Sequence, residues 1–141
     1  MCRKLIGSLA VTLTLAACSN VIHCSPCNAG LRIYVSSLRA GSTAVRTCVD
    51  SACGPIRPIR EAWPAVSPGG KFYDPKTVEL LVYRGSKLTD TYSAVIVLQP
   101  PDKDKTCDCG ESRQLTPGPN GSLVECKYTD ETGCTSRDPQ R

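Results

Sequence analysis

Cysteine is the residue type that most constrains this chain, because ten of its 141 residues are cysteines. In an exported protein an even set of cysteines forms a disulfide framework, which stabilises a small fold rich in loops. The same side chain is also a metal ligand and the nucleophile of thiol–disulfide exchange. The compartment of the chain therefore decides how its cysteines are interpreted, and the amino terminus indicates that compartment.

The first 17 residues have the pattern of a signal peptide. Arg3 and Lys4 form a short positive segment, and the stretch from Leu5 to Ala17 is uncharged and apolar apart from three hydroxyl residues. A helix needs about 20 residues to cross the core of a bilayer, so this stretch is too short for a membrane span and has the length of a signal peptide. We expect the chain to be exported and residues 1–17 to be removed.

The end of this segment, Leu15-Ala16-Ala17-Cys18, resembles the bacterial lipobox, which has a branched aliphatic residue, two small residues and a cysteine. The resemblance implies that lipoprotein-processing enzymes attach a diacylglyceryl group to the Cys18 thiol, cut the bond before it and in some cases acylate the new amino group, as with palmitate. Two or three acyl chains make a stable anchor, at about 0.8 kcal/mol per buried methylene. The alternative is an ordinary secretory signal, which would leave Cys18 as one more disulfide cysteine.

This interpretation predicts a location and a first partner. The protein is expected on the extracytoplasmic side of the cell membrane, with membrane lipid held through acylated Cys18. If the source is Gram-negative, the outer membrane becomes the expected destination, because Ser19 is not aspartate.

The remaining cysteines support the lipid anchor. Cys2 leaves with the signal peptide and Cys18 takes the lipid, so eight disulfide candidates remain: Cys24, Cys27, Cys48, Cys53, Cys107, Cys109, Cys126 and Cys134. An even set allows up to four bridges. If Cys18 were structural, nine cysteines would remain and one of them would be unpaired.

The mature chain has strand patterns and no helical pattern of useful length. Leu31, Ile33 and Val35 alternate with polar residues, which is the period of a half-buried strand. Further strands are expected at residues 44–49, 78–83, 87–92, 93–98 and 122–128, and residues 93–98, as the most apolar stretch, are expected in the centre of a sheet. Residues 54–77 are rich in proline and are expected to form a loop, with a short edge strand at residues 71–73.

These elements predict one all-β domain, a small immunoglobulin-like β-sandwich with disulfides. The expected organisation is a signal peptide at 1–17, a lipidated tether at 18–29, the sandwich at 30–128 and a C-terminal tail at 129–141, loose except at Cys134. Within the sandwich, Asp50 and Ser51 can close a two-residue hairpin loop that places Cys48 opposite Cys53. In a non-hydrogen-bonded pair their Cα atoms lie about 4.5 Å apart, so spacing predicts this bridge.

The chain resembles small lipoproteins of high-GC Gram-positive bacteria, most of them uncharacterised, in three features. These are the lipobox, the hairpin Cys48-Val49-Asp50-Ser51-Ala52-Cys53 and the turn Pro119-Asn120-Gly121. The chain departs from that pattern in its Cys107-Asp108-Cys109 cluster and its cysteine-bearing tail. The resemblance implies a lipid anchor and no particular activity.

His23-Cys24-Ser25-Pro26-Cys27 is the most suggestive chemical motif. A Cys-x-x-Cys pair can exchange disulfides, and with His23 it can hold copper or zinc, completed by Cys107 or Cys109. Structural disulfides are the favoured interpretation for an exported chain, because no helix or βαβ pattern follows the motif. A tethered thiol–disulfide or metal-handling protein that uses Cys24, Cys27 and His23 remains the alternative.

Other catalytic patterns are missing from the sequence. His23 is the only histidine and lies five residues after Cys18, which makes histidine-dependent triads improbable. There is no phosphate-binding glycine loop, no calcium loop and no HExxH motif, and the carboxylates are scattered. We therefore expect a non-enzymatic protein without cofactor or bound metal.

Charge and aromatic residues give weaker indications about partners. Without Arg3 and Lys4 the formal charge falls from +4 to +2, and residues 30–60 carry five arginines against only Asp50. The arginines are spread out and aromatics are scarce, so nucleic-acid binding is not expected. The single tryptophan, Trp63, is interpreted as covering an edge of the core, with a binding anchor as the alternative. The leading hypothesis is a binding or structural module of the cell envelope, with an envelope protein or polymer as its partner.

Overall fold

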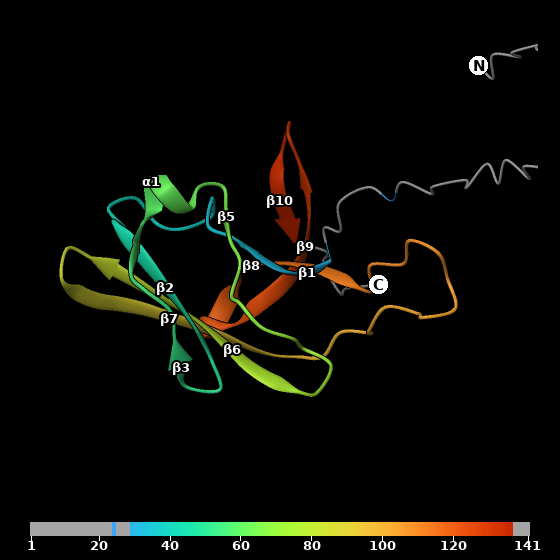
Figure 1. Cartoon of the computed structure of the whole chain (residues 1–141). Helices are drawn as coiled ribbons and strands as arrows, with labels where there is room; N and C mark the ends of the chain where they lie inside the picture. The colour runs from blue at the N-terminus through green and yellow to red at the C-terminus, as the bar shows by residue number, and fades with distance from the viewer. Residues whose placement is uncertain (1–23, 25–28, 137–141) are drawn as a thin grey trace, which may run out of the picture.

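Two β-sheets packed face to face form the framework of the described chain (Figure 1). The computed structural model describes Cys24 and residues 29–136. The first sheet has the strand order β10-β9-β8-β1-β5, and the second has the order β3-β2-β6-β7, with β4 paired to β2. This arrangement confirms the predicted all-β sandwich.

The strands of the first sheet come from both ends of the described chain. They are β1 (Gly30–Tyr34), β5 (Ala65–Val66), β8 (Ser112–Pro117), β9 (Leu123–Thr129) and β10 (Gly133–Ser136). β1 runs parallel to β8, with Ile33 opposite Leu115, and every other pairing in this sheet is antiparallel. A short 3-10 turn, η1 (Pro119–Gly121), joins β8 to β9.

The second sheet is antiparallel and is formed by the middle of the chain. Its strands are β2 (Ala44–Val49), β3 (Ala52–Cys53), β4 (Arg57–Pro58), β6 (Lys76–Arg84) and β7 (Lys87–Ile96). The only α-helix among the described residues is α1 (Ile59–Ala62), a single turn between β4 and β5. No helix in the described part of the chain is long and apolar enough to cross a membrane.

The core lies between the two sheets and follows from the alternation of side chains along each strand. Val78, Leu80 and Val82 of β6 lie on one face of the strand and are fully buried. Leu31 and Ile33 of β1 meet them from the opposite sheet in one apolar cluster. Phe72, in the connection before β6, is also part of this cluster.

Two predictions about residues 87–98 are wrong, as the structure of β7 shows. Residues 87–96 form one strand of ten residues, not two strands, and that strand lies at the end of its sheet, not in the centre. Ile96 and Leu98 point into the core, but Val95 is 69% exposed and Val97 is exposed as well. An unbroken apolar run predicts a strand that is buried on both faces, whereas only alternate residues of this run are buried.

Three further differences concern the segments between the main strands. β8 was not expected, because Leu115 is the only aliphatic residue of Ser112–Pro117. Residues 71–73 form no strand; the proline-rich segment instead holds β4, α1 and β5. The predicted loose tail is ordered as far as Ser136, because β10 pairs with β9.

Two disulfides close hairpins of the sandwich, and a third joins segments that are far apart in the sequence. Cys48 is bonded to Cys53 across the β2–β3 hairpin, with 3.9 Å between the Cα atoms, as the hairpin register predicts. Cys126 is bonded to Cys134 across the β9–β10 hairpin. Cys24, from the predicted tether, is bonded to Cys107 in the connection between β7 and β8. The signal peptide, Cys18 and the rest of residues 18–28 lie outside the described residues.

Candidate functional site

The proline-rich segment of residues 54–69 carries the most distinctive surface of the sandwich. β4 pairs with β2 of the second sheet, and β5 pairs with β1 of the first sheet, so this segment crosses from one sheet to the other. Between the two strands, Ala62 of α1 is buried in the core. The chain is thus fixed at both ends and at its centre, while the side chains between these points are free to face the solvent.

Hydrogen bonds hold the second half of this segment against β1. The Val35 N–H donates to the Pro64 carbonyl at 3.0 Å, and the Ser67 hydroxyl donates to the Leu31 carbonyl at 2.9 Å. These contacts extend the two-residue pairing of β5 on both sides. They keep the surface around β5 in a defined shape.

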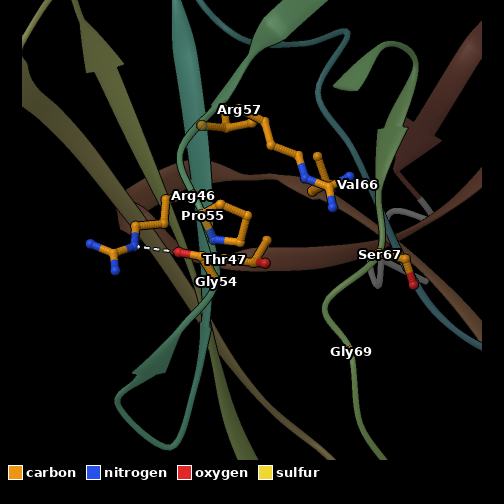
Figure 2. A pocket seen from close by; sticks show the side chains of 9 residues that line it. Arg46, Thr47, Gly54, Pro55, Arg57, Val66, Ser67 and Gly69 are labelled. Carbon is orange, nitrogen blue, oxygen red and sulfur yellow. Dashed lines mark hydrogen bonds between the residues drawn. The ribbon is translucent and has the colours of Figure 1, made fainter. Parts of the chain in front are cut away.

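A cavity of about 120 Å³ lies between the two halves of the segment (Figure 2). It is lined by Val45, Arg46, Thr47, Gly54, Pro55, Arg57, Val66, Ser67 and Gly69. None of these residues is acidic. The cavity has room for a small anionic group or for one side chain of a partner, and it is too small for a large organic substrate.

The two arginines of this cavity differ in their roles. The Arg46 Nε donates to the Gly54 carbonyl at 2.7 Å and so ties β2 to the residues after β3. Figure 2 shows the Arg57 side chain reaching across the cavity toward Val66, while the Arg46 guanidinium points the other way. Within the described chain, the Arg57 guanidinium has no ion pair. Arg57 is therefore a cation that the first cavity offers to a ligand.

A second cavity of about 230 Å³ shares Val66 and Ser67 with the first. Its other lining residues are Arg32, Tyr34, Pro64 and Ala65. Trp63 directly precedes this lining and is 58% exposed, and Ile56, near the first cavity, is 53% exposed. We name Ile56, Arg57, Trp63 and the two cavities the α1 surface.

Trp63 does not cover an edge of the core, so that prediction is wrong. α1 ends at Ala62, which is the residue that enters the core, and Trp63 follows in extended backbone. Phe72, which is 2% exposed, is the aromatic residue between β5 and β6 that packs inside. Tryptophan and arginine are among the residue types that most often carry binding energy in protein interfaces, so the alternative interpretation of Trp63 as a binding anchor stays a prediction.

The predicted cysteine site is arranged differently from a redox pair. Cys24 is bonded to Cys107 and so is not half of a Cys24–Cys27 disulfide. The sulfurs of Cys24 and Cys107 form this disulfide, so neither of them is a thiolate ligand for a metal. Cys109 is disulfide-bonded as well. His23 and Cys27 lie outside the described residues, and no group of metal-binding side chains occurs within them.

The carboxylates with shifted pKa values have structural partners. The Lys76 ammonium and then the Thr77 N–H lower the pKa of Asp50, and the ammonium lies 2.9 Å from the carboxylate. The N–H groups of Gly110 and Asp102 lower the pKa of Asp108. These contacts hold turns and loops in place.

The carboxylate of Glu111 likewise has structural partners that lower its pKa. The Gln99 N–H and then Arg113 lower the pKa of its carboxylate. Arg113 also pairs with Glu125 at 3.2 Å, so the cavity beside β8 and β9 that these residues line is charge-compensated. This balance makes it a weaker candidate than the α1 surface for binding a charged ligand.

No protein family matches the chain, and no curated protein or solved structure is significantly similar to it. Sequence alone could have pointed to Trp63 and Arg57 only as surface candidates, since their exposure depends on which neighbour enters the core.

Proposed function

We propose that this protein is an extracytoplasmic lipoprotein, anchored through Cys18, whose disulfide-stapled sandwich binds a macromolecule of the cell envelope and catalyses no reaction. The observation that carries the proposal is the state of the cysteines. All seven cysteines among the described residues are disulfide-bonded. Disulfides persist in oxidising compartments and are rare in the cytosol, so this pattern supports export.

The α1 surface supports binding as the activity of the domain. It combines an exposed tryptophan, an exposed isoleucine and an arginine that has no ion pair with any described residue, on a segment that both sheets hold in place. A rigid surface loses little conformational entropy when a partner docks. A tethered redox or metal-handling protein is less well supported, because Cys24 and Cys107 are disulfide-bonded to each other.

The lipid anchor is tested by substitution of the modified cysteine. Cys18→Ser is expected to move the protein from the membrane fraction to the soluble fraction, because no acyl chain can be attached to serine by this route. The unsubstituted chain and a Cys2→Ser variant serve as controls, and both are expected to remain with the membrane. Retention of Cys18→Ser in the membrane fraction contradicts the proposed anchor.

The non-redox role is tested by counting thiols. Alkylation of the native, unreduced mature protein followed by mass spectrometry is expected to modify no cysteine. The same treatment after full reduction gives the total number as a reference. Two reactive thiols at Cys24 and Cys27 in the native protein would favour the redox alternative instead.

The binding role is tested by site-specific photo-crosslinking in the producing cell. A photoreactive phenylalanine analogue at Trp63 is expected to give discrete adducts of higher mass, since a bound partner lies within reach. The matched control places the same analogue at Tyr73, which is exposed but lies outside the α1 surface. Equal patterns at the two positions, or none at Trp63, contradict binding through this surface.

A further inference from the structure

The Cys24–Cys107 bridge joins the predicted tether to the far side of the sandwich from α1. We infer that this bridge sets the orientation of the domain on the membrane, with the β7–β8 connection facing the bilayer and the α1 surface facing away from it. The inference rests on the proposed lipid anchor at Cys18. This orientation also indicates the class of partner that the α1 surface binds, which is a soluble protein rather than a lipid.

The first step is the length of chain between the anchor and the bridge. Cys24 follows Cys18 by six residues. An extended chain covers at most about 3.6 Å per residue, so the bridge lies within about 22 Å of the anchored residue. Without the bridge, the first residue of the sheets is Gly30, twelve residues after Cys18, which allows about 43 Å.

The second step is the size of the domain. A compact domain of about 110 residues has a radius of gyration near 13 Å, which corresponds to a globule about 34 Å across. A tether of about 22 Å is shorter than this diameter. The bridged domain therefore cannot turn upside down to bring its opposite end to the bilayer, whereas an unbridged domain can.

The third step is the position of the two ends. In Figure 1 the orange connection between β7 and β8, which contains Cys107, lies at one end of the sandwich, and α1 lies at the other. Trp63 comes directly after α1 in the chain. The bridged connection and α1, with Trp63 directly after it, are thus at opposite ends of the domain.

The fourth step is the rigidity of the bridged connection. The Asp108 carboxylate accepts hydrogen bonds from the N–H groups of Asp102 and Gly110, at 2.8 and 2.9 Å. At its base, the Glu111 N–H donates to the Gln99 carbonyl, and the Glu111 carboxylate accepts from the Gln99 N–H. These contacts fix Cys107 relative to β8, so a constraint on Cys107 is a constraint on the whole sandwich.

The orientation selects among ligands for the α1 surface. Lipid headgroups would also suit Arg57 and Trp63, but the bridged domain holds these residues away from the bilayer. A protein segment that presents a carboxylate and apolar side chains matches both the unpaired guanidinium and the exposed Ile56 and Trp63. We assign this class of partner to the surface.

The experiment uses the intact lipidated protein in liposomes and its single tryptophan as the probe. Flotation first establishes that the protein is bound to the vesicles. Lipids with a spin label at the headgroup are then expected to quench Trp63 fluorescence only weakly. A Trp63→Phe/Lys105→Trp variant moves the probe into the β7–β8 connection, and its quenching is expected to be several-fold stronger.

The bridge itself is tested by its removal. In Cys24→Ser/Cys107→Ser/Cys109→Ser protein, with any remaining thiol alkylated, Trp63 quenching is expected to rise toward that of the Lys105→Trp probe, because the longer tether permits all orientations. Near-ultraviolet circular dichroism verifies that the variant is folded; if it is not, the comparison of the two tryptophan positions in the bridged protein decides alone.

The outcomes separate the two proposals. Failure to float overturns the lipid anchor, and the orientation with it. Flotation with equal or stronger quenching at Trp63 than at Lys105→Trp overturns the orientation and leaves the anchor standing. Strong quenching at Trp63 would make lipid headgroups, not a soluble protein, the ligand of the α1 surface.

Discussion

At the scale of single residues, burial separates side chains that look alike in the sequence. Phe72 and Trp63 both lie between β4 and β6, yet Phe72 is inside the apolar cluster and Trp63 faces the solvent. The difference arises because Ala62 takes the inward position at the end of α1. The two arginines of the first cavity also differ. The Arg46 side chain donates a hydrogen bond to the Gly54 carbonyl, whereas the Arg57 side chain reaches across the cavity (Figure 2).

Substitution of these two aromatic residues should have unequal effects on stability. Trp63→Ala is expected to change the free energy of unfolding by no more than about 0.5 kcal/mol, as for other exposed positions. Phe72→Ala is expected to cost about 3–5 kcal/mol, because it leaves a cavity in the core. Guanidinium denaturation of the two variants beside the unsubstituted protein measures both values. A large loss in Trp63→Ala would mean that Trp63 packs inside after all.

The Asp50 pair predicts a dependence of stability on pH. The Lys76 ammonium, the larger cause, and the Thr77 N–H lower the pKa of Asp50 in the folded protein. A lowered carboxyl pKa stabilises the fold above the unfolded pKa of about 3.9, and this contribution disappears as pH falls through the folded pKa. Asp50→Asn is a suitable variant, because asparagine tolerates the positive φ of 47° at this position.

The Asp50→Asn protein is expected to have a lower denaturation midpoint than the unsubstituted protein at pH 7. The difference should stay constant well above the unfolded pKa of about 3.9 and vanish as pH falls below the folded pKa, as Asp50 itself becomes protonated. Urea denaturation across this range measures it. A difference that persists unchanged at low pH would show that the charge of Asp50 is not its cause.

At the scale of elements, the connections between strands determine which edges are exposed. β7 is the longest strand at the end of a sheet, and unpaired edge strands of this length invite aggregation. Ser93 of β7 bridges to Ser122, directly after η1, and a Cβ at Gly121 would lie 3.1 Å from the Thr91 carbonyl oxygen. The β8–β9 turn therefore covers part of the β7 edge.

Two glycines with positive φ provide a matched test of the β7–β8 connection. Gly85→Ala places a Cβ in open space and is expected to cost about 1–2 kcal/mol, from left-handed backbone strain alone. Gly110→Ala should cost more, because its Cβ would lie 2.9 Å from the Pro101 nitrogen and 3.0 Å from the Gln99 oxygen. Thermal denaturation ranks the two variants. Equal losses would mean that the connection is looser than its hydrogen bonds indicate.

At the scale of the whole molecule, disulfides add to a core of modest size. The bridge between Cys24 and Cys107 spans 83 residues of sequence. By restricting the unfolded chain, a bridge of this span contributes about 4–5 kcal/mol in the chain-entropy model. Small domains have a total stability of about 5–15 kcal/mol, so the bridges account for a large share of it.

Reduction followed by alkylation is therefore expected to lower the free energy of unfolding by at least about 4 kcal/mol. The reduced protein should be largely unfolded at 37 °C, while the oxidised protein keeps its β-sheet circular dichroism. Guanidinium denaturation of both forms measures the difference. An unchanged midpoint would place the stability in the apolar core alone.

The sequence by itself determined the features that depend on neighbouring residues. The all-β class follows from the period-two pattern, the buried face of β6 follows from Val78, Leu80 and Val82, and the Cys48–Cys53 bridge follows from the register of a two-residue hairpin loop. In each case the residues that interact are close in sequence, so local geometry is sufficient to bring them together.

Only the tertiary structure decided the features that depend on distant segments. Eight cysteines allow 105 pairings, and the bond between Cys24 and Cys107 results from the fold that brings residues 83 apart together. The parallel pairing of β1 with β8 and the edge position of β7 likewise depend on how the sheets assemble. Trp63 is exposed for the same reason, because competition among all apolar side chains for one core is settled only when the two sheets close on each other.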